Sequence, residues 1–173
     1  PVMRIYLVGF MGSGKSTLGQ RVALSMQVPY LDTDNIAEAQ SGMSVAEILE
    51  SLGEPYFRHL EADILRQTTI YPKSITATGG GLPCFEDNMS WMNQYGITVY
   101  LQWPDELLAK HLAKIRASRP LLSSLTDTEA RQKISELLET RKPVYEKAAI
   151  TVELKGDLES DFAILEKACR YIW

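Results

Sequence analysis

The sequence of 173 residues has little that could support a disulfide framework or a metal cluster, because it contains only two cysteines and two histidines. Cys84 and Cys169 lack metal-ligand spacing, and neither His59 nor His111 lies near a cysteine in the sequence. We therefore expect two reduced, buried thiols. The net charge of -4 also argues against a general surface for nucleic acid or anionic membranes. Any bound anion must be held by a local group of cations.

Long apolar runs are also missing, and the first residues do not combine a basic segment with an apolar stretch and a cleavage site. We therefore expect a cytoplasmic protein with no membrane partner. The hydrophobic content of 45% over this length is enough for one domain, residues 1–173, with a core of its own.

Short apolar runs alternate with segments of helical periodicity. Strands are expected at residues 4–8, 28–31, 74–77, 97–102 and 150–154, several of them rich in β-branched residues. Helix boundaries are indicated by capping boxes at 44–47 and 126–129, a stop at Gly53 and a first-turn proline at Pro104. The alternation predicts a parallel sheet covered by helices on both faces, with ligands at the carboxyl ends of its strands.

The stretch "GFMGSGKST", residues 9–17, follows the first expected strand and opens a helix, as the phosphate-loop pattern G-x-x-x-x-G-K-[ST] requires. A glycine-rich turn before an ordinary helix would not need a Lys–Ser pair after the last glycine. In this motif Lys15 reaches the outer phosphates and Ser16 supplies its hydroxyl to Mg²⁺. The residues expected to bind the nucleotide are Gly12, Ser13, Gly14, Lys15, Ser16 and Thr17.

"YLDTDNIAE", residues 30–38, sets Asp32 and Asp34 just after the second strand. By themselves these carboxylates fit a metal site, a catalytic base or a helix cap. Beside a phosphate loop, Asp34 is placed to orient and deprotonate an attacking hydroxyl. Asp32 is better suited to the metal, through its water shell, although a capping role applies to both residues.

Four further motifs follow in order: "GEPYFRHLE" at 53–61, "TGGG" at 78–81, "RPLL" at 119–122 and "RKPVYEKAA" at 141–149. With the phosphate loop and "DTD", they make nearly the whole chain resemble the shikimate kinase family. The resemblance implies a three-layer α/β/α phosphate-loop NTPase fold with a five-stranded parallel sheet, like the nucleoside monophosphate kinases. It also implies phosphorylation of the 3-hydroxyl of shikimate by ATP with Mg²⁺, in aromatic amino-acid biosynthesis.

The resemblance also assigns an acceptor-binding region, residues 33–61, and several acceptor residues. In the family Asp34 binds the acceptor hydroxyl, and Arg58 and Arg141 hold the acceptor carboxylate. Local sequence alone would instead make Arg58 one half of an exposed ion pair with Glu61. In the family Gly80 contacts the substrate, so the glycine triplet, Gly79, Gly80 and Gly81, is expected to bind it, although it could otherwise be a loose turn. No aspartate ends the third expected strand, residues 74–77, which precedes the triplet. Asp32 is therefore expected to take more of the metal role.

Residues 112–126 are expected to form a mobile lid. Its Arg119 is either a solvated charge or an arginine that closes over the phosphates and stabilises the transition state. Lys114, Arg116 and Lys155 are the candidates for bordering the adenine, and the sequence does not distinguish among them. A lid-closing kinase of this size needs no partner subunit, so we expect a monomer.

Two alternatives remain at this point. The nearer one is a related kinase that acts on gluconate, a nucleoside monophosphate or another small hydroxyl compound. The paired arginines and the glycine triplet argue for a small carboxylated acceptor instead. The other is a nucleotide-binding regulatory protein that has lost catalysis. The presence of Lys15, Ser16, Asp34 and Arg119 together speaks against it.

Overall fold

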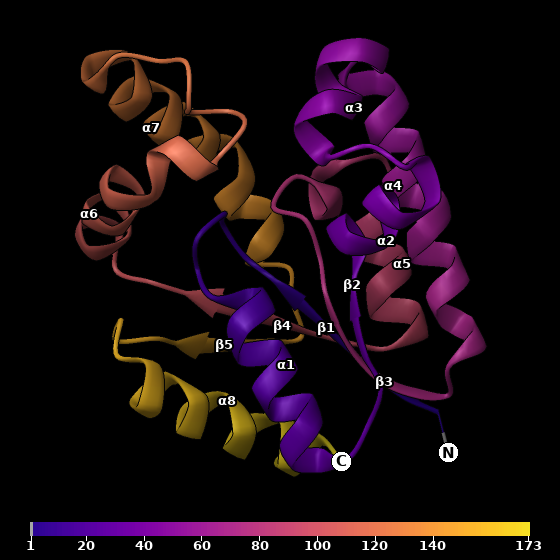
Figure 1. Cartoon of the computed structure of the whole chain (residues 1–173). Helices are drawn as coiled ribbons and strands as arrows, with labels where there is room; N and C mark the ends of the chain where they lie inside the picture. The colour runs from indigo at the N-terminus through magenta and orange to yellow at the C-terminus, as the bar shows by residue number, and fades with distance from the viewer. Residues whose placement is uncertain (1) are drawn as a thin grey trace.

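A computed structural model describes residues 2–173, which form a five-stranded parallel sheet between layers of helices (Figure 1). The strands are β1 (Met3–Val8), β2 (Tyr30–Asp32), β3 (Lys73–Ala77), β4 (Ile97–Gln102) and β5 (Ile150–Glu153). The helices are α1 (Lys15–Met26), α2 (Thr33–Ser41), α3 (Val45–Leu52), α4 (Glu54–Gln67), α5 (Asn88–Tyr95), α6 (Asp105–Ile115), α7 (Asp127–Tyr145) and α8 (Leu158–Ile172). Short 3₁₀ helices span Thr68–Ile70, Leu82–Cys84 and Arg116–Ser118. The predicted fold class is confirmed.

The sheet has the strand order β2-β3-β1-β4-β5, so β1 lies at its centre. Within β1, Tyr6 and Val8 belong to one hydrophobic cluster, while Ile5 and Leu7 belong to another on the opposite face. Both faces of β1 are therefore buried, as expected for a parallel sheet between two helical layers, and this explains why its sequence is apolar without alternation.

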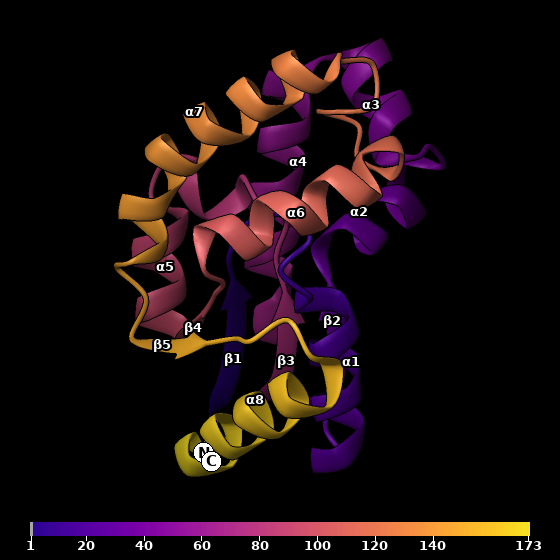
Figure 2. The same cartoon turned by 90° about the vertical axis from the view of Figure 1, so that its left-hand side faces the viewer.

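Helices α1 and α8 lie together on one face of the sheet (Figure 2). Residues of α4, α5, α6 and α7 join the cluster on the other face. A third, smaller cluster contains Ala37, Ile48, Phe57 and Ile64 and holds α2, α3 and α4 together beside β2. This helical group contains most of residues 33–61, the region expected to bind the acceptor.

The helix boundaries follow the local signals with small differences. Both capping boxes are present, and Gly53, with φ +86°, ends α3 and begins α4. The second strand was predicted to start at residue 28, but β2 begins at Tyr30 and ends at Asp32. Pro104 precedes the first turn of α6 and is its N-cap, so its predicted place was wrong by one residue. None of the helices described for residues 2–173 is long and apolar enough to span a bilayer.

Candidate active site

The carboxyl ends of β2, β3 and β1 lie side by side because these strands are neighbours in the sheet. Hydrogen bonds tie the segment after β3 to its two neighbours. The Gly79 N–H donates to Thr33 Oγ1 at the start of α2 over 3.0 Å, and the Thr78 hydroxyl donates to the Leu7 carbonyl in β1 over 2.8 Å. The phosphate loop, the "DTD" segment and the glycine triplet therefore meet at one edge of the sheet, where ligands bind in folds of this kind.

The phosphate loop has the backbone that its glycines permit. Gly12 and Gly14 have φ of +75° and +91°, which a side chain would strain, and Gly14 is the N-cap of α1. A Cβ on Gly12 would also lie 2.9 Å from Ile115 Cδ1, so α6 packs directly against the loop. Ser13 is fully buried, and its hydroxyl has no partner among the described residues. The loop and the start of α1 can therefore receive the oxygens of a phosphate.

The ammonium of Lys15 is folded back on its own loop. Its Nζ donates to the carbonyls of Gly9 (2.6 Å) and Phe10 (2.8 Å). Burial lowers the pKa of Lys15 to about 7, although the carboxylates of Asp34 and Asp32 act in the opposite direction. A phosphate group beside this amine would favour its charged form, so the site is suited to an anionic ligand.

Asp32 is the helix cap, and Asp34 is not. One oxygen of Asp32, Oδ1, accepts the backbone N–H groups of Asp34 and Asn35 at the start of α2. The other, Oδ2, accepts the hydroxyls of Ser16 (2.7 Å) and Tyr30 (3.0 Å). Capping and the predicted metal role can therefore coexist in Asp32, because each uses a different oxygen.

The oxygens of Ser16 and Asp32 fit a magnesium ion that is held mainly by the phosphates of a bound nucleotide. Ser16 and Asp32 bring two hard oxygens together beside the phosphate loop. Within residues 2–173 no group of three or more His, Cys, Asp or Glu side chains could hold a metal alone. Mg²⁺ commonly binds through one or two protein oxygens, substrate phosphates and water, which is the arrangement these residues allow.

Asp34 lies in the first turn of α2, two residues after the end of β2 and so just after the second strand, as expected. Burial, and next the charge of Asp32, raise the pKa of Asp34 to about 6, while Lys15 opposes them. No hydrogen bond occupies the side-chain oxygens of Asp34 among the described residues. An acid of this pKa is ionised at neutral pH and still basic enough to accept a proton.

Arg58 forms the predicted ion pair with Glu61, but the interpretation of that pair as exposed is wrong. The Nη1–Oε2 distance is 2.6 Å, and the side chains of Arg58 and Glu61 are only 12% and 1% exposed. Arg58 also donates from Nη2 to Glu54 Oε1 over 3.1 Å. The pair is buried because α4 turns this face toward the glycine triplet, which sequence spacing alone does not reveal.

Glu61 is a site residue that the sequence analysis did not identify. Its Oε1 is buried without a partner among the described residues, and burial raises its pKa to about 7. A signal was available: Glu61 follows Phe57 by four residues and so lies on the face of α4 that Phe57 buries. An acidic residue at a core-facing helix position indicates either a satisfied ion pair or a binding site.

Each glycine of the triplet lies next to one or two charged side chains. A Cβ on Gly79 would lie 2.5 Å from Glu61 Oε1 and 2.9 Å from Asp34 Oδ1. One on Gly80 would lie 3.2 Å from Arg141 Nη1, and one on Gly81 would lie 2.5 Å from Arg58 Nη2. The triplet therefore lacks side chains where α2, α4 and α7 bring their charged groups close to the backbone.

Arg141 lies on α7 and is only 7% exposed, yet none of the ion pairs within residues 2–173 involves it. The other buried arginine, Arg4, donates to three backbone carbonyls and has a structural role. Arg119 is also near, and its buried Nε has no partner. One cavity is lined by the predicted acceptor residues and Arg119 together: Asp34, Arg58, Gly79, Gly80, Gly81, Arg119 and Arg141.

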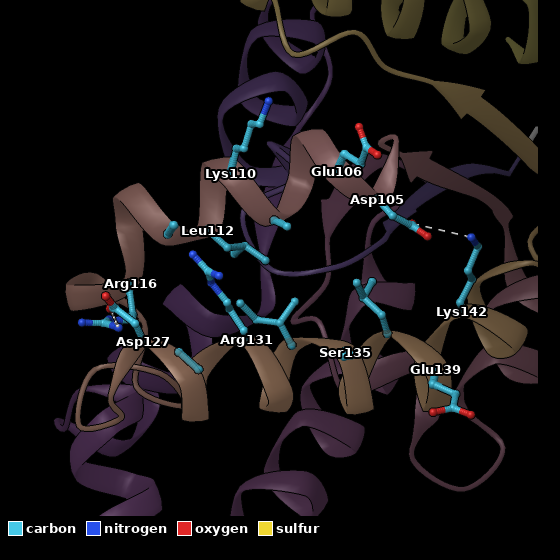
Figure 3. Close-up of a pocket in the computed structure, with 15 residues that line it drawn as sticks. Asp105, Glu106, Lys110, Leu112, Arg116, Asp127, Arg131, Ser135, Glu139 and Lys142 are labelled. Atoms are coloured by element: carbon cyan, nitrogen blue, oxygen red, sulfur yellow. Dashed lines mark hydrogen bonds and ion pairs between the residues drawn. The ribbon is translucent and has the colours of Figure 1, made fainter.

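The expected lid, residues 112–126, comprises the end of α6, a 3₁₀ helix and hydrogen-bonded turns. Leu122 in this segment is completely buried, while Lys114 is exposed. Arg116 pairs with Asp127 and lines a separate groove of about 920 Å³ between α6 and α7 (Figure 3). That groove contains none of the residues assigned to catalysis or acceptor binding. Which basic residue borders the adenine stays a prediction.

Both cysteines are free thiols, but they differ in burial. Cys169 is completely buried, as predicted. Cys84 is only half-buried and lines a cavity that also contains Arg58 and Arg141, so the expectation of a fully buried thiol is wrong for this residue. Burial raises the pKa of Cys84, so that at neutral pH it is a thiol rather than a thiolate.

The charges of Lys15 and Asp34 influence each other's pKa at the end of the sheet, Lys15 from the phosphate loop and Asp34 from the helix that follows β2. This arrangement defines a phosphate-loop kinase, in which an anionic donor and a small acceptor meet at the carboxyl ends of parallel strands. The family model for shikimate kinase matches residues 11–172. The chain belongs to the shikimate kinase family.

Individual relatives agree with the family match. The chain is 40% identical over 159 residues to a shikimate kinase of Parabacteroides distasonis, covering 91% of this chain and 92% of the relative. A 1.7 Å crystal structure of shikimate kinase from Bacteroides thetaiotaomicron has a TM-score of 0.87 at 34% identity, covering 97% and 98% of the two chains. Shikimate kinase from Acinetobacter baumannii, solved in complex with shikimate, has a TM-score of 0.85 at 34% identity, covering 98% and 94%.

A more distant structure shows how far the fold extends. A gluconokinase from Sinorhizobium meliloti has a TM-score of 0.60 at 16% identity and covers 99% of this chain and 93% of its own. At this identity the likeness concerns the fold alone.

Proposed function

We propose that this protein is a shikimate kinase, which transfers the γ-phosphoryl group of ATP to the 3-hydroxyl of shikimate and yields shikimate 3-phosphate and ADP. The observation that carries the proposal is one cavity in which Asp34, Arg58 and Arg141 converge on the glycine triplet beside Arg119. The matched family, and the complex of the Acinetobacter baumannii shikimate kinase with shikimate, support the choice of acceptor.

The nucleotide side is proposed as follows. The backbone of residues 12–17 receives the phosphates of ATP, and Lys15 leaves its loop carbonyls to contact the outer ones. Mg²⁺, when bound, neutralises charge on the phosphates; Ser16 is the candidate direct ligand and Asp32 acts through water. The hydrogen bond between Ser16 and Asp32 supports this pairing.

On the acceptor side, Arg58 and Arg141 hold the carboxylate, because two planar guanidinium groups suit a planar anion. Gly79, Gly80 and Gly81 give the ring room beside the backbone. Asp34 orients the 3-hydroxyl and takes its proton as the oxygen bonds to the γ-phosphorus and the bond to the ADP oxygen breaks. The net negative charge of the chain does not prevent the binding of an anionic acceptor, since cationic side chains are concentrated in the site.

Arg119 is proposed to move over the phosphates when the segment 112–126 closes. Its buried Nε without a partner supports this role, because such a donor is costly unless a ligand or a rearrangement satisfies it. We further propose that the enzyme is a cytoplasmic monomer of aromatic amino-acid biosynthesis, with no nucleic-acid or membrane partner.

A coupled assay of ADP release tests the proposal. With Mg·ATP, folded protein is expected to release ADP when shikimate is added, and much more slowly with gluconate or a nucleoside monophosphate. Absence of shikimate-dependent ADP release would refute the proposed acceptor. Nucleotide binding without phosphoryl transfer to shikimate, gluconate or a nucleoside monophosphate would favour the alternative of a regulatory protein.

A further inference from the structure

Tyr145, the last residue of α7, is in contact with the same glycine as Arg141. Its hydroxyl donates a hydrogen bond of 2.5 Å to the carbonyl of Gly80. Arg141 lies one helical turn earlier, and its Nη1 would be 3.2 Å from a Cβ on Gly80. One face of α7 therefore presents a guanidinium and a phenol to the middle of the glycine triplet.

The hydroxyl of Tyr145 is held as a hydrogen-bond donor by its surroundings. The side chain is completely buried, and its ring lies 5.3 Å from that of Tyr100. Burial raises the pKa of Tyr145, and the nearby Arg141 opposes this shift without overcoming it. The phenol consequently keeps its proton at neutral pH and can donate it in a hydrogen bond.

The carbonyl of Gly80 depends on this donor. The carbonyls of Gly79 and Gly81 accept backbone N–H groups from the following 3₁₀ helix, those of Leu82 and Cys84. Among the described residues, only Tyr145 donates to the carbonyl of Gly80. Because a trans peptide bond sets its C=O and N–H on opposite sides, fixing this carbonyl also fixes the direction of the Gly81 N–H.

We propose that Tyr145 is a positioning residue for the acceptor: its hydroxyl holds the Gly80–Gly81 peptide and α7 together, so that the triplet and Arg141 meet the acceptor in one fixed arrangement. This proposal rests on the proposed function. Without the hydroxyl, the peptide planes of the glycine-rich segment are free to rotate. The entropy cost of ordering them then weakens acceptor binding.

Tyr145→Phe tests this, because it removes the hydroxyl and keeps the ring that fills the core. We expect the KM and the Kd for shikimate to rise about tenfold, the size of effect of one buried hydrogen bond. The KM for ATP and kcat should stay within about threefold of the parent values. A role confined to stability would lower the melting temperature and leave the KM for shikimate unchanged, and that result would overturn the proposal.

Tyr6→Phe is the matched control. Tyr6 is also completely buried, and its hydroxyl forms a 2.9 Å hydrogen bond with Thr68 Oγ1, which does not line the acceptor cavity. It should lower stability as Tyr145→Phe does, but leave the KM for shikimate unchanged. An equal rise of that KM in both variants would also overturn the proposal.

Replacing Tyr145 by p-aminophenylalanine restores an N–H donor at the same place and should recover most of the shikimate affinity. It also provides a folded comparison if Tyr145→Phe fails to bind ADP. If this replacement binds ADP normally but has the weak shikimate affinity predicted for the Phe variant, the hydrogen bond is not the cause. A parent enzyme that does not turn over shikimate would refute the proposed function, whereas an active parent with an unaffected Tyr145→Phe would refute only the role of Tyr145.

Discussion

The Ser16 hydroxyl donates a 2.7 Å hydrogen bond to Asp32 Oδ2 and so joins the start of α1 to the end of β2. The same aspartate caps α2 through its other oxygen. A single carboxylate thus fixes the helix that carries Asp34 relative to the loop that is proposed to hold the nucleotide.

Two substitutions separate these roles of Asp32. Asp32→Asn keeps a capping side chain and removes the charge, whereas Asp32→Ala removes both. We expect both variants to need more Mg²⁺ for half-maximal activity, and only Asp32→Ala to lose a further ~1 kcal/mol of unfolding free energy. Magnesium titrations of the ADP-release rate and urea unfolding provide the two measurements. An unchanged magnesium requirement in both variants would remove Asp32 from the metal site.

Asp34→Asn removes the proposed base and keeps the size of the side chain. The kcat of the variant should fall by at least about 100-fold, because general-base catalysis accelerates reactions by factors of that order. The KM for ATP should change little, since Asp34 belongs to the acceptor side. Steady-state kinetics with each substrate varied separates the two effects, and a kcat equal to that of the parent would exclude Asp34 as the base.

The pH dependence of the reaction should report the same residue. A carboxyl must be ionised to accept a proton, so kcat/KM for shikimate should rise with pH through about 6, the pKa of Asp34. ATP should be saturating, because bound phosphate keeps the amine of Lys15 charged above its pKa of about 7 in the free protein. Glu61 also titrates near neutral pH, so Glu61→Gln serves as the control and should retain the rise near 6. A flat profile between pH 5 and 7 would contradict the assignment.

Glu61 should make the stability of the fold depend on pH. Its pKa rises from an ordinary 4.5 to about 7 in the folded chain, so the folded state keeps a proton that the unfolded state releases. The stabilising contribution of the protonated group is therefore complete below about pH 4.5 and is lost as pH rises through 7. Relative to Glu61→Gln, the parent should lose unfolding free energy between pH 5 and 8. Urea unfolding at several pH values measures this, and a constant difference between the two proteins would contradict it.

The three site arginines should differ in kinetics. Arg58→Ala and Arg141→Ala should each raise the KM for shikimate by about 10- to 100-fold, the cost of losing one charge-assisted contact. Arg119→Ala should instead lower kcat by at least about 100-fold, since it is assigned to the transition state. Arg21→Ala is a control for charge removal, because Arg21 pairs with Glu159 on the surface and lies outside the site. The assignment fails if Arg119→Ala leaves kcat unchanged.

Local signals in the sequence were enough for the fold and the nucleotide side. The spacing of glycines around Lys15 is a local pattern, and the apolar run of β1 indicates burial whichever elements cover it. Both can therefore be interpreted without tertiary information. The resemblance then supplied the acceptor residues, and the structure brings Asp34, Arg58 and Arg141 into one cavity.

Tertiary packing decided what the sequence could not. Either Asp32 or Asp34 could have capped α2, and the structure gives the cap to Asp32, the last residue of β2. The Arg58–Glu61 pair became buried only because α4 packs against the glycine triplet. The role of Tyr145 is not evident in the sequence, since its hydrogen bond to Gly80 spans 65 residues.

A crystal structure with ADP, Mg²⁺ and shikimate tests the central claim most directly. We predict that the shikimate carboxylate lies between Arg58 and Arg141 and that its 3-hydroxyl lies within hydrogen-bonding distance of Asp34, facing the nucleotide phosphates. A carboxylate bound away from both arginines, or a 3-hydroxyl out of reach of Asp34, would contradict the account.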